Sequence, residues 1–181
     1  MGFSPPFQVT PGRQSLVTPR CERYTFRMPQ NPGEFTTRPV MKVDVPAIIA
    51  LYRRAIVPEW IVGGRSYDLD RVEANLNARL DTAGYTTDVV TRDDVLVGYL
   101  AWEQHADHTS HHVVAHLRML LVDPTVQRSG VATRLVERFE GAAKSAGCTK
   151  VLFDVIVGSP ANDFYAQLGF RHWSNYMEKL L

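Results

Sequence analysis

The chain has 181 residues, enough for one well-formed hydrophobic core and too few for two ordinary domains. Its 20 basic and 19 acidic residues give a formal net charge of +1, so no surplus of positive charge indicates binding to nucleic acid or to an anionic membrane. It has no apolar run of transmembrane length, no secretory signal, and two cysteines (Cys21 and Cys148) without the spacing of a disulfide framework or redox motif, so we expect a cytoplasmic protein.

Residues 1–35 differ in composition from the rest of the chain. They contain six prolines and three glycines and show neither a helical nor a strand period, which predicts an extended or partly disordered arm. Their four arginines and few acidic residues also resemble an organelle transit peptide, but the prolines would break the amphipathic helix that such peptides use. We therefore expect one folded domain over residues 36–181.

From Thr36 onward, strand and helix patterns follow one another regularly. Asp44 is placed to cap the first helix, with Pro46 in its first turn. Asp93 and Asp94 join two strand-like segments as in a β-hairpin. The elements predicted for this half are a short strand after Thr36, helices from Asp44 to Ile56 and over 70–80, and strands over 85–92 and 95–104.

The second half continues the pattern. A strand within 111–124 ends at Pro124 and leads into an amphipathic helix that Gly147 closes. Residues 150–157 form a continuous apolar run, as expected of a central strand covered on both faces. A short helix from Ser159 to Gly169 follows, and 170–180 are predicted to form one or two strands. The order βααββ, then βαβαβ, indicates an α/β or α+β fold, a mixed sheet with helices on both faces.

The segment "VDPTVQRSGVATRL", residues 122–135, joins a strand to a helix through a glycine and small or polar residues. The first N–H groups of a helix have no internal partner and the helix dipole adds partial positive charge, so such a junction can bind an anion. Gly130 would let the backbone approach a ligand closely, and Ala132 would keep the next turn uncluttered. The spacing fits neither a P-loop nor a Rossmann fingerprint. By itself the junction is also consistent with an ordinary tight turn.

Two segments together resemble the signature of a known family. Residues 127–132, Gln-Arg-Ser-Gly-Val-Ala, fit the Gln/Arg-x-x-Gly-x-Gly/Ala signature of the GCN5-related N-acetyltransferases (GNAT). About 35 residues further on, "FYAQLGF" (Phe164 to Phe170) matches the family's aromatic-Tyr-x-x-x-Gly-Phe segment. The predicted element order over 36–181 is also that of the family. The resemblance implies the acyl-CoA N-acyltransferase fold, with a mostly antiparallel central sheet.

The resemblance implies acetyl-CoA as the acyl donor. Its pyrophosphate would be held by backbone amides between Gln127 and Thr133, with Arg128 either adding charge or remaining solvated. The strand before this loop would separate from the neighbouring segment "LFDVIV", and the pantetheine arm would pair with backbone near 120–122. The residues expected to bind the cofactor in these two ways are Leu120, Leu121, Val122, Gln127, Arg128, Ser129, Gly130, Val131, Ala132 and Thr133.

Two positions depart from the family pattern, and one of them lies shortly before the tyrosine. Many members carry an asparagine seven residues before the tyrosine, where this chain has Gly158. Asn162 lies only three residues before the tyrosine, so it is a weaker candidate contact for the cofactor.

The resemblance also implies two catalytic positions. Tyr165 would protonate the departing thiolate or orient the sulfur, while the alternative is an aromatic ring packed on the last helix. Many members place a glutamate eleven residues before the signature's first residue, and here that position is His116. An imidazole titrates near neutral pH and can act as the general base for the amine. A water chain or Glu103 are the alternatives.

Histidines are concentrated at His105, His108, His111 and His112, just before His116. No cysteine joins them and they lie in a predicted turn, so we expect no metal site. By analogy with the fold, aromatic and acidic residues of the early helices are candidates for lining the acceptor pocket. These are Tyr52, Glu59, Trp60, Tyr67 and Asp68.

The predicted activity is acetyl transfer from acetyl-CoA to a primary amine of a small molecule. We expect direct transfer in a ternary complex, because neither cysteine lies in a motif typical of an acyl-enzyme. The alternatives are a protein or peptide N-acetyltransferase and a non-catalytic acyl-CoA-binding regulatory module. An acidic pocket would favour a polyamine or aminoglycoside, and an open groove would favour a peptide. A homodimer is the expected oligomeric state, since dimers are common in the family.

Overall fold

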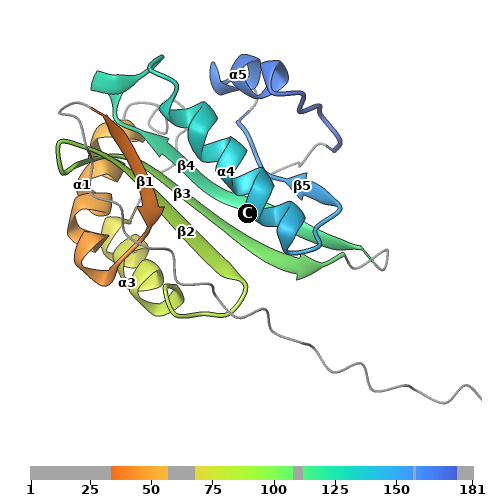
Figure 1. The fold of residues 1–181 in the computed structure, drawn as a ribbon, viewed down its shortest axis with the longest axis horizontal. Coiled ribbons are helices and arrows are strands. Elements are labelled where there is room, and N and C mark those ends of the chain that lie inside the picture. Colours follow the sequence, from red (N-terminus) through yellow and green to blue (C-terminus); the bar gives the residue numbers. More distant parts are fainter. Residues whose placement is uncertain (1–33, 57–67, 108–111, 157, 175–181) are drawn as a thin grey trace, which may run out of the picture.

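The structure, a computed structural model, describes residues 34–56, 68–107, 112–156 and 158–174, and in these ranges it contains a five-stranded sheet in the order β1-β2-β3-β4-β5 (Figure 1). The first four strands pair antiparallel and β5 pairs with β4 in parallel, so the sheet is mixed and mostly antiparallel, as predicted. The strands are β1 (Phe35–Pro39), β2 (Tyr85–Arg92), β3 (Val95–Ala106), β4 (Val113–Val122) and β5 (Lys150–Leu152). The helices are α1 (Val45–Ala55), α3 (Leu69–Arg79), α4 (Val131–Ser145) and α5 (Ala161–Gln167), with 3-10 turns η1 (Lys42–Asp44) and η2 (Pro124–Val126).

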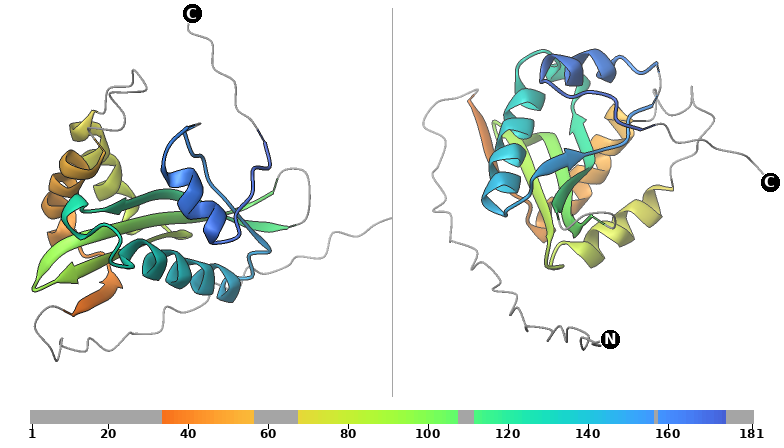
Figure 2. Two further views of the ribbon diagram at one scale, coloured as in Figure 1. Left: turned by 90° about the horizontal axis from the view of Figure 1, so that it is seen from above. Right: turned by 90° about the vertical axis from the view of Figure 1, so that its right-hand side faces the viewer.

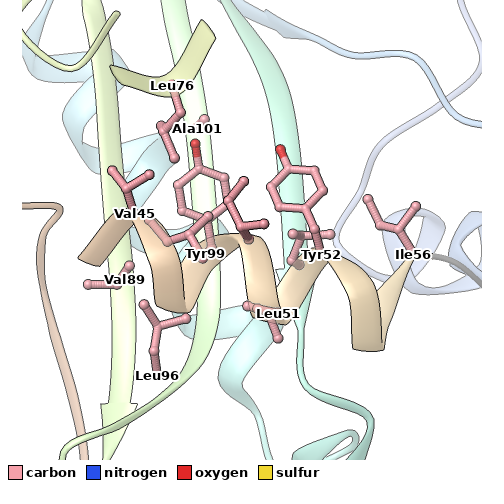
Figure 3. Packing of buried hydrophobic residues seen from close by; sticks show 12 residues of the cluster. Val45, Leu51, Tyr52, Ile56, Leu76, Val89, Leu96, Tyr99 and Ala101 are labelled. Atoms are coloured by element: carbon pink, nitrogen blue, oxygen red, sulfur yellow. The ribbon is translucent and has the colours of Figure 1, made fainter. Parts of the chain in front are cut away.

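Helices cover both faces of the sheet, which confirms the predicted layers. The left panel of Figure 2 views the sheet nearly edge-on, with α1 and α3 on one side and α4 on the other. The first core cluster joins α1 and α3 to β2, β3 and β4, and in it Leu51 and Tyr99 are almost fully buried (Figure 3). Burial of this apolar stripe, rather than helix propensity, is what holds α1 on the sheet.

The first turn of α1 differs from its prediction in one respect. Asp44 occupies the cap position, but its side chain bonds none of the helix amides. Its carboxylate accepts instead from the N–H of Met41, at 2.7 Å, and from the guanidinium of Arg38, at 2.6 and 2.8 Å. Asp44 therefore fastens the turn η1 to β1. Apart from Glu34 and Phe35, the predicted N-terminal arm lies outside the described residues, and Phe35 already belongs to β1.

The prediction of a central strand over 150–157 is wrong. β5 covers only Lys150–Leu152, and its residues are exposed or half-buried rather than covered on both faces. The apolar run leaves the sheet after Leu152. Phe153 packs instead against Tyr165 and Phe170, with ring centroids 4.2 and 5.1 Å away. An apolar run reports burial but not whether a sheet or a helix provides it.

The C-terminal segment also differs from its prediction in the part that is described. Residues 170–174 form no strand, and the rest of the predicted strand region lies outside the described residues. The helix before it ends as predicted, with Gly169 in the left-handed region at φ 86°.

Helix α4 approaches the other face of the sheet very closely at Gly98. A Cβ atom added to Gly98 would lie 2.8 Å from Cγ1 of Val131 and 3.2 Å from Cδ1 of Leu135, both in the first turns of α4. The absence of a side chain on β3 thus sets how near the start of α4 lies to the sheet.

We expect Gly98→Ala to lower the free energy of unfolding by about 1–3 kcal/mol, because the added methyl group overpacks this contact. Urea denaturation measures the change. Gly141→Ala is the matched control, since a Cβ at this α4 position meets nothing within 4 Å and alanine favours a helix by up to about 1 kcal/mol. Equal unfolding free energies for the two variants would contradict the prediction.

Candidate active site

Strand β4 extends well beyond its parallel partner. Pairing with β5 is limited to three positions and ends at His116, which pairs with Leu152. From Leu117 to Val122 no strand lies beside this edge of β4 within the described part of the chain. The two strands therefore separate, as the resemblance implied for this position. An unpaired edge presents N–H and C=O groups to which an extended, amide-containing ligand can bond.

A β-bulge lies at the point where β5 leaves β4. Ala101 pairs with Met119 and Trp102 with Leu117, so Arg118 is an extra residue on β4. Beyond the bulge the side-chain alternation changes phase, and Leu117 and Leu120 both pack toward α4. Bulges commonly re-aim side chains beside functional sites. Here the bulge separates the paired part of β4 from the part with the open edge.

The open edge leads directly into the loop before α4. Arg128 and Gly130 both adopt the left-handed region, with φ 63° and 84°, and residues 127–130 are exposed. A Cβ at Gly130 would meet nothing within 4 Å, so the space beside it is open. The N–H groups of residues 131–133 have no acceptor among the described residues. Such a turn, followed by free amides at a helix start, is an arrangement that can bind an anion.

Asp123 supports this loop and was missed in the sequence. Its buried carboxylate accepts two hydrogen bonds from Thr125, one from the backbone N–H at 3.0 Å and one from the side-chain hydroxyl at 2.7 Å. It accepts a third from Nε of Arg54 at 2.8 Å. These bonds lower the pKa of Asp123, against the effect of burial, which is the largest single influence and raises it. The available signal was an Asp-Pro pair directly after an apolar strand, which favours a turn.

Tyr165 lies on α5 and packs against the α4-side core through its ring, next to Phe153 and Phe170. Burial raises the pKa of its phenol to about 12. The hydroxyl has no hydrogen-bond partner within the described residues. The side chain thus combines a packed ring, which was the alternative interpretation, with a protonated hydroxyl available to a ligand.

Asn162 is held by its own loop. Its side-chain amide donates to the carbonyl oxygens of Ile156, at 3.1 Å, and Ser159, at 2.8 Å. The amide N–H groups thus shape the turn before α5, in which Gly158 has φ 81°. A contact between Asn162 and a cofactor stays a prediction.

His116 lies at the last position of β4 that pairs with β5, on the face of the sheet opposite α4. Its side chain is 16% exposed, and Nε2 lies 3.8 Å from Oδ2 of Asp154, too far for a hydrogen bond. The ring of His105 lies 5.8 Å away. Burial, followed by the charge of Arg118, lowers the pKa of His116 although Asp154 opposes the shift. His116 is therefore neutral at neutral pH, the form in which an imidazole accepts a proton.

Glu103, the weaker candidate for the base, faces His116 across the β3–β4 pair. Its carboxylate accepts from Nε of Arg118 at 2.7 Å and also from Nη2 of Arg79. Burial is the largest influence on its pKa and raises it, but the two arginines outweigh burial and the pKa is lowered. An ionised carboxylate held by two guanidinium groups is a poor proton acceptor.

Several other candidates lie elsewhere. Tyr52 is buried in the core, as Figure 3 shows, and Asp68 caps α3 by accepting from the N–H of Arg71. A role for either in the acceptor pocket stays a prediction. Glu59, Trp60 and Tyr67 lie outside the described residues, as do His108 and His111. In the described ranges, no three histidine, cysteine, aspartate or glutamate side chains gather as a metal site requires.

Comparisons with known proteins agree with this geometry. The family model described as "Acetyltransferase (GNAT) family" matches residues 47–170. No curated protein matches the chain.

Among solved structures, the chain is similar to an acetyltransferase of Trypanosoma brucei (22% identity, TM-score 0.63, covering 82% of this chain and all of that one). It is also similar to an aminoglycoside antibiotic 6'-N-acetyltransferase of Acinetobacter baumannii (20% identity, TM-score 0.66, covering 82% of this chain and 99% of that one). A third similar structure is that of AAC(6')-Iy in complex with a bisubstrate analogue, CoA-S-monomethyl-acetylneamine (16% identity, TM-score 0.68, covering 82% of this chain and 98% of that one). At these identities the structures share the fold alone.

None of the helices in the described ranges has the length and hydrophobicity of a membrane-spanning helix.

Proposed function

Because the chain belongs to the acetyltransferase (GNAT) family, we propose that it transfers the acetyl group of acetyl-CoA to a primary amine of a small molecule, by direct attack in a ternary complex. The observation that carries the proposal is the continuity of two binding features. The unpaired edge of β4 runs straight into the anion-binding turn at residues 127–133. An extended arm that ends in a pyrophosphate matches this sequence of features.

Each part of the donor has a proposed binding group. The backbone of residues 120–122 pairs with the amides of the pantetheine arm, and the free amides within residues 127–133 hold the pyrophosphate. Those of Gln127 and Ser129 already donate to the carbonyl oxygens of Pro124 and Val126, so the free N–H groups at the start of α4 make the main contribution. The left-handed conformations of Arg128 and Gly130 support this assignment, because such residues shape turns whose N–H groups can face an anion. Asp123 and Arg54 fix the base of the loop, so the amides are oriented before the anion arrives.

On the acceptor side, His116 removes a proton from the ammonium group, directly or through one water molecule. The free amine then attacks the thioester carbonyl carbon, forming the C–N bond. A backbone N–H on the open part of β4 stabilises the tetrahedral oxyanion. The intermediate collapses as the C–S bond breaks, the nitrogen loses its second proton to become the neutral amide, and the thiolate of CoA takes up one proton in exchange.

Tyr165 acts on the leaving sulfur. Its phenol, with a pKa of about 12, is a weaker acid than a thiol of pKa about 8.5. We therefore propose that it stabilises the departing thiolate mainly by a hydrogen bond that strengthens as charge develops, rather than by complete proton transfer.

The test of the proposed function is a thiol-release assay with acetyl-CoA and a broad panel of primary amines. Acetylation of a small amine, with product identified by mass spectrometry, is the expected result. Binding of acetyl-CoA without transfer to any amine of the panel would contradict the proposal and favour a regulatory module.

We expect His116→Ala to lower kcat/KM by about 10²-fold or more, the usual range for removal of a general base. Because burial and Arg118 lower the pKa of His116, the basic form predominates above pH 6.5 and is lost as the pH falls below that value. The acidic limb of the wild-type pH profile should therefore lie below pH 6.5. It should disappear in His116→Ala and return in His116→Glu, which restores a basic side chain. An unchanged acidic limb in His116→Ala would show that another group is the base.

The cytoplasmic location and the homodimer remain predictions from the sequence.

A further inference from the structure

The face of the sheet that carries His116 also carries two arginines that share one carboxylate. Arg79, from α3, and Arg118, from the bulge of β4, both donate to Glu103 on β3. Two guanidinium groups and one carboxylate leave an excess of one positive charge. The carboxylate lies inside, with 16% of its side chain exposed, whereas the two arginines are 43% and 41% exposed. The outward side of the cluster is therefore cationic.

Arg118 keeps hydrogen-bond donors that Glu103 does not use. Its Nε and Nη2 atoms both point at one carboxylate oxygen, and its Nη1 group has no partner among the described residues. Arg79 contributes Nη2 to Glu103 and stacks on the ring of Tyr85, 4.4 Å from the centroid. Because Glu103 and Tyr85 fix both side chains, binding an external anion would require little further ordering of the arginines.

Arg118 lies close to the proposed base. It follows His116 by two positions, and both face Glu103, His116 as its partner across the strand pair and Arg118 through its guanidinium group. On the other side of His116 lies the carboxylate of Asp154, 3.8 Å from Nε2 and 63% exposed. Within the described ranges, His105 and Glu103 are the other titratable groups that face His116. The imidazole thus lies between an acidic group and a cationic one.

We propose that this cluster selects the acceptor: Arg118, held by Glu103 and supported by Arg79, binds a carboxylate of the acceptor while the acceptor's amine lies against His116 and Asp154. The acceptor is then a small amine with a carboxylate near its nitrogen, an amino acid, rather than a polyamine or an aminoglycoside. This inference rests on the proposed function and specifies its substrate class.

The charge distribution argues against a polycationic acceptor. A polyamine requires several carboxylates without partners, but the carboxylate closest to His116 across the sheet is already bound to two arginines. Asp154 can attract one ammonium group, and a second cation on the Arg118 side would meet like charge. An amine with an adjacent carboxylate complements both sides.

The experiment compares matched acceptor pairs, each amino acid with its own carboxamide, in the thiol-release assay, together with spermidine and an aminoglycoside. The wild-type protein should favour the best amino acid over its amide by about tenfold or more in kcat/KM, as expected for charge-assisted hydrogen bonds to Arg118. In Arg118→Gln this ratio should fall to about one, through a higher KM for the acid. Arg118→Lys should keep part of the preference, because it retains charge but not the guanidinium geometry.

Arg92→Gln is the matched control. Arg92 lies at the opposite end of β2 from Tyr85, is 48% exposed and forms an ion pair with Asp93, so its loss should leave the ratio unchanged. A purely structural role for Arg118 would lower the activity toward acid and amide alike, and the unchanged ratio would overturn the inference. Equal or better turnover of amides or polyamines by the wild-type protein would overturn it too, yet leave the proposed function intact. Failure of acetyl transfer to every amine, with acetyl-CoA bound, would instead contradict the proposed function itself.

Discussion

We expect the Tyr165→Phe variant to bind acetyl-CoA as tightly as the wild-type protein and to turn over about 10²-fold more slowly. The phenylalanine retains the ring contacts with Phe153 and Phe170, and the lost hydroxyl has no partner in the described part of the chain. The fold and the donor site should therefore be unaffected. What is lost is the hydrogen bond to the leaving sulfur, which matters only as the C–S bond breaks. Single-turnover rates and acetyl-CoA titration separate the two effects.

Tyr99→Phe is the control for removal of a buried phenol hydroxyl. Tyr99 lies in the core on the face of the sheet that α1 covers (Figure 3), whereas Tyr165 packs on the α4 side. The hydroxyl of Tyr99 bonds with Tyr85 rather than lying free, and its replacement should leave the single-turnover rate at saturating acceptor near that of the wild type. A rate for Tyr165→Phe within a factor of about two of wild type would show that the tyrosine is only a packing residue.

The pH dependence of the catalytic rate gives a second test of the role of Tyr165. Because burial raises the pKa of Tyr165 to about 12, the phenol keeps its proton throughout an ordinary assay range. The wild-type profile should therefore show no alkaline limb from Tyr165 below about pH 11, and Tyr165→Phe should lower the plateau without changing the profile's shape.

We expect Gly130→Ala to weaken acetyl-CoA binding by about 10- to 100-fold. Gly130 has φ 84°, a conformation that strains an alanine. It is the N-cap residue of α4, directly before the helix amides that are proposed to hold the pyrophosphate. Loss of one charge-assisted hydrogen bond costs about 1.5–3 kcal/mol, which corresponds to this range of affinity. Isothermal titration calorimetry with acetyl-CoA measures the change.

Gly147→Ala separates backbone strain from ligand binding. Gly147 follows the same helix at its other end, has φ 79°, and likewise leaves open space where a Cβ would lie. Both variants should lose a similar stability, about 1 kcal/mol, because both force an alanine into the left-handed region. Only Gly130→Ala should lose affinity. Equal affinities in the two variants would place the pyrophosphate elsewhere.

Local patterns were sufficient to predict most of the elements. The hairpin at Asp93 and Asp94, the amphipathic helix closed by Gly147 and the short helix ended by Gly169 all occur as predicted, because periodicity and turn residues act over a few positions. The loop at residues 127–133 was identified for the same reason. A glycine between a strand and a helix already specifies free amides at the helix start.

Contacts between distant segments had no such local signal. The close approach of α4 to Gly98, the bond from Arg54 to Asp123 and the sharing of Glu103 by Arg79 and Arg118 each join residues far apart in the sequence. The same limitation explains the error over 150–157, where Phe153 is covered by aromatic side chains of a later segment and not by a sheet.

The sequence by itself determined the family and the order of the elements as far as α5, and it predicted the donor loop, since each depends on residues adjacent along the chain. Only the tertiary structure decided which charged groups lie beside His116. A one-residue bulge in the pairing of β4 with β3 brings Arg118 onto Glu103. Just before the bulge, His116 is the last position of β4 that pairs with β5. Register is a property of two strands together, and the charge pattern that faces the acceptor follows from it.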